Sequence, residues 1–320
     1  MKPTVSVQIV TFNSGKDIEN CLKAVKNQSY LIHRIIVIDN NSNDDTLLKV
    51  KEFKNVEIVE NKNNVGFAQG HNQGMFMTDT DYVLVLNPDV QLHEKYIEYI
   101  VEALEANISS GMATGKLYRD MEKQILDSTG IQMKKNRRAI DRGTGEIDTG
   151  QYDTMNLIFG VSGAAAIYKR EMISSISINQ EFFDESFFAY KEDVDVSWRA
   201  QILGWESLFV NKATAIHRRG WKEDKKRSEI PVYIRRKSYM NRYFYIVKND
   251  QLTYYMFHLP FILFFELVSF FYTVLKEREL LSSWKFIKQQ WKSLKLKRAF
   301  IMSNRKKSNK QIYSFFKGVW

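Results

Sequence analysis

The segment VSVQIVTFN at residues 5–13 decides the fold, because it is a short apolar run, rich in β-branched residues, that ends in polar ones. Such a run predicts a buried strand of a parallel sheet. The pattern recurs as RIIVIDNNS at residues 34–42 and as YVLVLNPD at residues 82–89, while residues 16–28 and 44–53 have helical spacing. Strands that alternate with helices predict an α/β fold with a Rossmann-like, mostly parallel central sheet.

Polar residues follow the predicted strands at their carboxyl ends, which is where parallel sheets bind ligands. They are Thr11, Asn13, Asp39 and Asp89. The Asp39 carboxylate can accept the imide N–H of uracil or thymine, or it can cap the next helix. Asp89 can hold Mg²⁺ or Mn²⁺, which take their other ligands from water and substrate phosphates. Read alone, the Asn-Pro-Asp sequence around it indicates only a turn.

Three further segments carry residue types that suit chemistry. In NVGFAQGHNQG at residues 64–74, glycines let the backbone approach a ligand and a helix start offers N–H groups to an anion, although a tight turn is the alternative. In YKEDVDVSWR at residues 190–199, an acid can serve as general base, or the acids can simply stabilise a helix N-terminus. In ATAIHRR at residues 213–219, the histidine can ligate a metal and the arginines can pair with a diphosphate, but a lone histidine is more often structural.

Composition limits the class of protein. The 320 residues suffice for one large α/β domain with an appendage. Cys21 is the sole cysteine, which excludes an internal disulfide framework and fits a reducing compartment. The first residues lack the charged and apolar regions of a secretory signal, so we expect a cytoplasmic catalytic part.

The C-terminal part predicts membrane association. Residues 254–275 read YYMFHLPFILFFELVSFFYTVL, and His258, Pro260 and Glu266 interrupt an otherwise apolar stretch. We expect a helix in the membrane interface, or a short re-entrant segment, rather than a full span; a buried core helix or subunit contact is the alternative. Residues 276–320 carry 13 Lys and Arg against 2 acidic residues, a net charge of +11 that leaves −1 for the rest. An apolar anchor beside a polybasic stretch suits an anionic membrane surface better than nucleic acid.

Six segments in order resemble the family 2 glycosyltransferases of the GT-A fold: VTFNS, IDNNSNDDT, NVGFAQGHNQG, LNPDV, FFAYKEDVDVSWRAQILGW and IHRRG. They are most similar to the rhamnosyltransferase-type members that build bacterial surface polysaccharides. The resemblance covers roughly residues 3–221. We therefore expect a GT-A domain at residues 1–250 and a helical, membrane-associating region at residues 251–320.

The resemblance also implies roles for individual residues. The nucleotide would lie against Thr11, Asn13 and Asp39, and the rest of the donor against Gly66, Ala68, Asn72 and Asn87. Asp89 would be the metal carboxylate of the family's DXD element, whose first Asp is Asn87 here, and His217 would complete the metal or diphosphate contacts. Asp193 would be the general base. The acceptor side would be formed by Glu192 and Asp195, with Trp198 and Arg199 packing behind them.

The function implied by the resemblance is that of an inverting glycosyltransferase dependent on Mg²⁺ or Mn²⁺. The preferred donor is dTDP-rhamnose, and the acceptor is a hydroxyl of a surface polysaccharide or lipid-linked saccharide in cell-wall or polysaccharide biosynthesis. A UDP-sugar donor (glucose, N-acetylglucosamine or galactofuranose) and a catalytically silent sugar-binding scaffold stay open, as does a homodimer. We expect a peripheral protein at the cytoplasmic face of the bacterial inner membrane, without a nucleic-acid partner.

Overall fold

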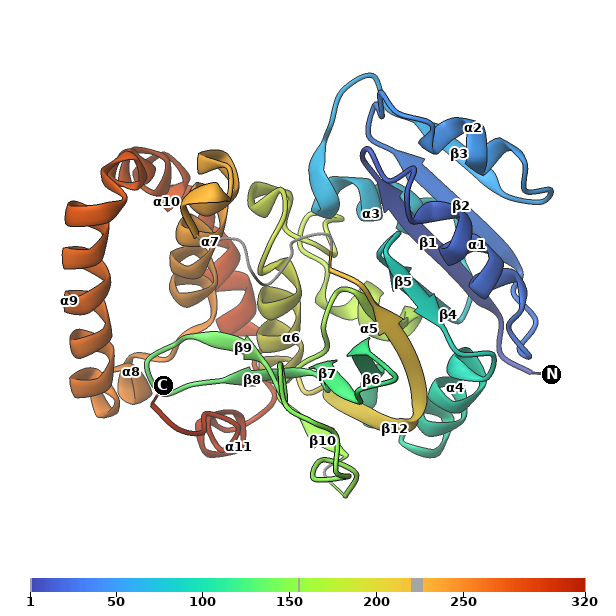
Figure 1. Cartoon of the computed structure of the whole chain (residues 1–320). Helices are drawn as coiled ribbons and strands as arrows, with labels where there is room; N and C mark the ends of the chain where they lie inside the picture. The colour runs from blue at the N-terminus through green and yellow to red at the C-terminus, as the bar shows by residue number, and fades with distance from the viewer. Residues whose placement is uncertain (1, 155, 220–226, 320) are drawn as a thin grey trace.

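The computed structural model describes residues 2–154, 156–219 and 227–319, and its centre is one large mixed sheet (Figure 1). Its strand order is β10-β12-β6-β11-β4-β1-β2-β3, with β5 paired to β12 and β7 paired to β6. The strands are β1 (Val5–Thr11), β2 (Arg34–Asp39), β3 (Glu57–Glu60), β4 (Tyr82–Leu86), β5 (Val90–Leu92), β6 (Ser110–Asp120), β7 (Ile125–Ser128), β10 (Leu157–Ile158), β11 (Ala165–Lys169) and β12 (Glu206–His217).

The N-terminal half of the sheet is parallel, as the sequence predicts. Strand β1 pairs in parallel with both β2 and β4, and β2 pairs in parallel with β3. Strand β11 is inserted antiparallel between β4 and β6, after which β6 and β12 pair in parallel again. The continuous apolar runs of β1, β2 and β4 follow from this arrangement, because strands covered on both faces have no polar side.

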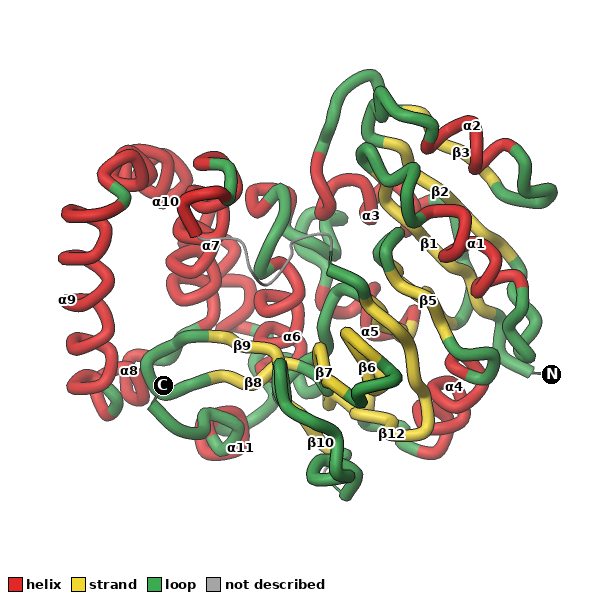
Figure 2. Tube along the Cα trace, in the orientation of Figure 1, coloured by secondary structure: helices red, strands yellow, loops and turns green. Residues whose placement is uncertain are grey.

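Helices cover both faces of the sheet (Figure 2). Helices α1 (Ile18–Lys26), α2 (Thr46–Lys51) and α4 (Tyr96–Ala106) share one apolar cluster with the sheet. Helices α3 (Gly66–Phe76), α5 (Arg170–Ile176) and α6 (Glu192–Ile202) share the cluster on the opposite face. In α1 the buried positions are 18, 21, 22 and 25, a spacing that places them on one helix face.

The C-terminal helices form a third layer against α6. They are α7 (Val232–Asn249), α8 (Leu252–Phe257), α9 (Leu259–Lys276), α10 (Ser283–Ser303) and α11 (Asn309–Tyr313), together with the hairpin of β8 (Ile131–Met133) and β9 (Ala139–Asp141) and short 3-10 turns at Glu185–Phe187, Arg227–Glu229 and Arg278–Ser282. A third apolar cluster joins α7, α8, α10 and α11 to α6 through Trp198. Residues on both sides of position 250 therefore share one buried core.

Helix α9 lies at the outer side of this layer (Figure 1) and is mostly exposed. Among the described helices it alone is long and apolar enough to cross a membrane. Its three polar or breaking residues have local explanations. His258 contacts the Arg137 guanidinium, Pro260 lies in the first turn where no N–H is needed, and Glu266 pairs with Arg242 on α7. The exposure of α9 argues against a buried core helix.

Candidate active site

Asp89 and His217 lie side by side because their strands pair. Asp89 directly precedes β5, and antiparallel pairing places His217, the last residue of β12, opposite Val90. The Asp89 Oδ1 and His217 Nε2 atoms are 3.3 Å apart, and both side chains are largely buried. The other ring nitrogen of His217, Nδ1, is 2.8 Å from Asp127 Oδ2. A histidine held by a carboxylate behind it is the usual arrangement around a metal-binding imidazole.

Burial and the neighbouring carboxylates have opposite effects on the pKa of His217. Burial disfavours the imidazolium, but the hydrogen bonds and charges of Asp127 and Asp89 outweigh it and raise the pKa of His217 to about 9. Burial likewise disfavours the Asp127 carboxylate, and its bonds to His217 and the nearby arginines nevertheless lower its pKa to about 2. Arg219 binds Asp127 at 2.7 Å and Asp141 at 2.6 Å, which fixes its guanidinium beside the histidine.

Asp193 lies in the first turn of α6. Its Oδ2 accepts the Gly163 N–H at 3.0 Å, and its Oδ1 accepts the Val194 N–H at 2.8 Å. Burial is the main reason that the pKa of Asp193 is raised, to about 6, with a further contribution from the Asp141 charge. Burial and the Asp193 charge also raise the pKa of the adjacent Glu192 well above its usual range. An aspartate ionised at neutral pH but more basic than usual suits a general base.

A single cavity of about 430 Å³ joins these groups. The structure thus brings Asp89, His217, Asp193 and Glu192 to one site, although they are separated by up to 128 positions in the sequence. The rest of the lining comes from Phe67, Asn87, Asp141, Ser162, Gly163, Ala164, Ala189, Tyr190, Lys191 and Arg219. Of the acceptor-side residues expected from sequence, only Glu192 reaches this cavity.

The loop before α6 is strained and is held by the glycine-rich helix α3. Phe188, Tyr190 and Lys191 all have positive φ angles, which non-glycine residues rarely adopt. The Ala68 N–H donates to the Phe188 carbonyl at 3.0 Å, and a Cβ on Gly66 would lie 2.5 Å from that same oxygen. The first turn of α3 therefore positions this loop.

Asn72 extends the same support. Its side chain binds the backbone N–H of Phe183 at 3.0 Å and the Phe183 carbonyl at 2.8 Å. Gly66, Ala68 and Asn72 lie behind the lining, whereas Phe67 between them is part of it. Direct donor contact by these three residues stays a prediction.

Thr11, Asn13 and Asp39 form a separate cluster at the ends of β1 and β2. Thr11 and Asp39 are paired in register, and the Thr11 hydroxyl donates to Asp39 Oδ1 at 2.9 Å. Ser42 donates to the same carboxylate through its N–H and its hydroxyl, and Asn13 accepts the Asn43 N–H at 2.8 Å. This cluster lies at the sheet edge where β4 also ends but is not part of the cavity lining. Its contact with a nucleotide stays a prediction.

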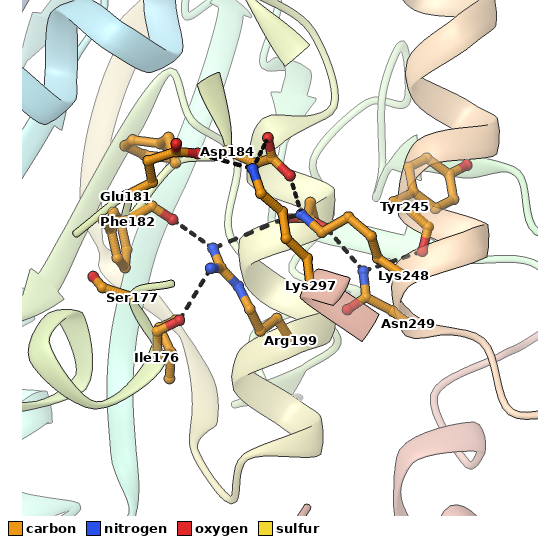
Figure 3. Close-up of polar contacts among 12 residues, drawn as sticks. Ile176, Ser177, Glu181, Phe182, Asp184, Arg199, Tyr245, Lys248, Asn249 and Lys297 are labelled. Carbon is orange, nitrogen blue, oxygen red and sulfur yellow. Dashed lines mark hydrogen bonds and ion pairs between the residues drawn. The ribbon is translucent and has the colours of Figure 1, made fainter. Parts of the chain in front are cut away.

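Asp195, Trp198 and Arg199 lie away from the cavity, on the side of α6 that meets the C-terminal helices. Asp195 is fully buried and accepts bonds from Lys248 at 2.7 Å and from the Asn249 side chain at 2.8 Å. The Arg199 guanidinium donates to the carbonyls of Ile176 and Phe182 (Figure 3). The buried contacts of Asp195 and Arg199 therefore stabilise the packing of α6 against its neighbours. The expectation that Asp195 lies on the acceptor side does not match this placement.

The residues present fit a divalent ion with two protein ligands. Two neighbouring ligands of an octahedral ion at about 2.1 Å lie about 3 Å apart, close to the 3.3 Å between Asp89 Oδ1 and His217 Nε2. Among the described residues, no group of three or more His, Cys, Asp or Glu side chains could hold a metal. Mg²⁺ and Mn²⁺ commonly complete such a site with water and substrate phosphate oxygens.

Several residues of this site escaped the sequence analysis. Asp127 and Asp141 belong to the polar segment at residues 116–152, in which the sequence shows no recognisable motif. Lys191 immediately precedes the acidic cluster and was not assigned a role. The last two residues of the resemblance, Gly220 and Trp221, lie outside the described residues.

Comparisons with known proteins show similarity to glycosyltransferases. A model of glycosyl transferase family 2 matches residues 6–176. N-acetylglucosaminyl-diphospho-decaprenol L-rhamnosyltransferase of Mycobacterium tuberculosis is 25% identical over 240 residues, which are 68% of this chain and 76% of that protein. Poly-beta-1,6-N-acetyl-D-glucosamine synthase of Staphylococcus epidermidis is 23% identical over 212 residues, 65% of this chain and 48% of the synthase.

Two solved structures share the fold. The mannosyltransferase PcManGT from Pyrobaculum calidifontis, in complex with GDP-Man and Mn²⁺, aligns over 98% of this chain and 88% of its own with a TM-score of 0.55. GalNAc-T7 with UDP, GalNAc and Mn²⁺ aligns over 77% and 48%, respectively, with a TM-score of 0.58. Both are 14% identical to this chain, so the likeness establishes the GT-A fold alone. Because the family model covers more than half of the sequence, the chain belongs to glycosyl transferase family 2.

Proposed function

We propose that this chain is a metal-dependent, inverting glycosyltransferase that moves a sugar from a nucleotide donor to an acceptor hydroxyl. The single observation that carries the proposal is the shared cavity. On one side Asp89 and His217 are spaced to hold one divalent ion, and on another Asp193 presents a carboxylate of raised pKa. A transferase of this kind needs a diphosphate site and a base within reach of the same anomeric carbon.

Asp193 takes the proton of the acceptor hydroxyl, whose oxygen forms a bond to the anomeric carbon. The bond from that carbon to the terminal phosphate oxygen of the donor breaks, and the nucleoside diphosphate leaves with the bonding electron pair. Attack opposite the leaving group inverts the configuration in one displacement, so no covalent enzyme intermediate forms. The transition state carries oxocarbenium character, as in glycoside hydrolysis.

The diphosphate side is served by Asp89, His217 and Arg219. A divalent ion held by the first two would offset the charge that grows on the departing diphosphate. Arg219, fixed by Asp127 and Asp141, adds a permanent positive charge in the cavity lining. Thr11, Asn13 and Asp39, further along the same sheet edge, would hold the nucleotide, with Gly66, Ala68, Asn72 and Asn87 shaping the rest of the donor pocket.

For the donor we prefer dTDP-rhamnose, because the Mycobacterium tuberculosis relative is an L-rhamnosyltransferase. The Staphylococcus epidermidis relative makes a polymer of N-acetyl-D-glucosamine, which supports a UDP-sugar as the alternative. For the acceptor we prefer a lipid-linked saccharide, because the name of the first relative includes N-acetylglucosaminyl-diphospho-decaprenol. The exposed apolar α9 and the basic residues after it support a peripheral position at the inner membrane, with residues 1–250 as catalytic domain and 251–320 as membrane-associating region.

The test is donor hydrolysis and transfer measured with dTDP-rhamnose beside UDP-glucose, UDP-N-acetylglucosamine and UDP-galactofuranose, each with Mn²⁺, with Mg²⁺ and with EDTA. We expect turnover of one donor only, dependent on metal, with an anomeric configuration in the product opposite to that of the donor by NMR. Turnover that persists in EDTA would contradict the metal site, and retention of configuration would contradict the role of Asp193. A chain that binds but never hydrolyses any donor would instead support the silent scaffold.

A further inference from the structure

A second cavity, of about 380 Å³, lies between α7, α9 and the β8–β9 hairpin. Its most prominent feature is charge. Arg138, Lys191, Arg227 and Arg242 all line it, together with hydroxyl groups such as that of Tyr239. Basic side chains gathered around one small cavity repel one another, and nearby anions reduce this repulsion.

The charge of this cavity is only partly compensated by the protein. Arg242 pairs with Glu266, and Arg227 forms two bonds of 3.0 Å to Glu277. The Nε atom of Arg242 is buried and has no hydrogen-bond partner within the described part of the chain. Burial, followed by repulsion from Arg242, Arg227 and Arg138, lowers the pKa of Lys191 to about 7, although Asp193 partly opposes this. A buried donor without a partner costs about 1–3 kcal/mol, which a ligand oxygen would recover.

This cavity lies between the candidate active site and helix α9. Lys191 lines both this cavity and the one that contains Asp193, so the two are neighbours. On its other side the cavity is lined by Phe265 and Ser269 of α9.

Helix α9 turns a different face outward. Its large exposed apolar side chains are Leu263, Phe264, Leu267, Val268, Phe270, Phe271, Tyr272 and Leu275. A cationic cavity thus separates the proposed base from an exposed apolar helix. A ligand that matches this order has a hydroxyl-bearing sugar, then an anionic linker, then an apolar chain.

We propose that this second cavity binds the phosphate or diphosphate linker of a lipid-linked acceptor, with Arg138, Lys191, Arg227 and Arg242 as its ligands. The lipid chain leaves along α9, and the sugar enters the neighbouring cavity toward Asp193. This inference rests on the proposed function for the identity of the second cavity's occupant. It adds that acceptor recognition depends on the linker and is independent of the metal.

The test uses binding to the full-length protein in EDTA, where the donor site has no metal. The probes are farnesyl diphosphate, inorganic pyrophosphate and farnesol, measured by titration calorimetry. The test variant is Arg138→Gln with Arg227→Gln, because both side chains are exposed and their removal leaves the core intact. The control variant is Lys51→Gln with Lys123→Gln, which removes two exposed charges elsewhere.

We expect the wild-type protein and the control to bind farnesyl diphosphate at least tenfold more tightly than either other probe. The test variant should lose about tenfold in affinity for farnesyl diphosphate with no change for farnesol. Equal binding of farnesyl diphosphate to test variant and wild type would overturn the proposal. So would farnesol or pyrophosphate binding as tightly as farnesyl diphosphate, because the first would show a purely apolar site and the second a site for free anions.

A parallel measurement separates this inference from the proposed function. Binding of dTDP and UDP with Mn²⁺ should be weakened by Asp89→Asn and unchanged in the arginine variant. If Asp89→Asn leaves nucleotide binding intact, the proposed metal site is wrong. The farnesyl diphosphate measurement then still tests whether the second cavity binds the linker. If the arginine variant weakens nucleotide binding as much as farnesyl diphosphate binding, the cavity is not a separate linker site and the inference fails.

Discussion

Replacing Asp193 by asparagine should lower the rate of transfer by at least about a hundredfold and, at the same time, make the folded protein more stable at alkaline pH. Asparagine keeps the shape of the side chain but cannot accept a proton, so loss of a general base predicts a fall in kcat of about 10²- to 10⁴-fold. Nucleotide binding should be nearly unchanged, because Asp193 contacts Gly163 and Val194 and no part of the metal pair.

The stability effect follows from the raised pKa. The pKa of Asp193 is about 6 in the folded protein against 3.8 for the free side chain. Because the folded value is the higher one, the protonated acid favours folding at low pH, and this advantage is lost as the pH rises from about 4 to about 6. A difference of about two pH units corresponds to about 3 kcal/mol. At pH 8 the wild-type carboxylate therefore carries a penalty that asparagine lacks.

Urea unfolding of both proteins at pH 4 and pH 8 measures this directly. Asparagine loses one of the two backbone hydrogen bonds, at about 1 kcal/mol, but this loss is the same at both pH values. The free-energy difference between variant and wild type should thus shift by about 2 kcal/mol toward the variant at pH 8, somewhat less than the full value because the unfolded carboxyl is already partly ionised at pH 4. The exposed Asp79→Asn control should show no such gain. An unchanged difference would refute the argument from burial, and retained transfer or lost nucleotide binding would refute the assignment as base.

Three other substitutions test separate parts of the structure. Asp89→Asn should lower Mn²⁺-dependent turnover by at least tenfold and raise the Mn²⁺ concentration needed for half-maximal rate; a curve identical to wild type speaks against the ion site. Gly66→Ala should cost about 1–3 kcal/mol in urea unfolding, since φ is +86° and the new Cβ meets the Phe188 carbonyl, and an unaltered midpoint would contradict the close packing. Asp184→Asn should cost about 3 kcal/mol at neutral pH because it removes one of the two carboxylates that pair with the buried Lys248 and one of the two that pair with Lys297; full stability there would show that the network in Figure 3 is not needed.

The parallel half of the fold was predictable because its signal is local. Residues 5–13, 34–42 and 82–89 each contain an apolar run and its polar end within ten residues, and parallel pairing places those ends at one edge. By contrast, α4 and β6 were not predicted. Strand β6 contains Ser110, Gly111, Thr114 and Gly115 among its buried positions, and these become strand residues only through pairing with β11 and β12.

In the candidate site, too, residues in local motifs were predictable and residues brought in by long-range packing were not. Asp89 and Asp193 could be singled out because each belongs to a short motif at the start or end of an element, and their roles stay predictions. Asp127 has no local motif and reaches His217 only through the fold. The sequence assigns Asp195 to the acceptor side because spacing alone cannot show which face of α6 meets the cavity. The structure turns Asp195 toward Lys248, and that lysine comes from a helix whose packing the sequence did not predict.

The exposed face of α9 gives a sharper membrane test than removal of the C-terminal region. Truncation would also delete Ile287 and Leu294 of α10, which belong to the buried cluster around Trp198, so a truncated protein could lose lipid binding by unfolding. Phe264→Glu with Phe271→Glu avoids this problem, because both side chains are more than half exposed. Placing two carboxylates on the apolar face should abolish flotation with anionic vesicles while leaving the unfolding midpoint unchanged. Leu48→Glu, at a still more exposed position on α2, should float like wild type. Flotation of the double variant at the wild-type level would move the membrane contact away from α9.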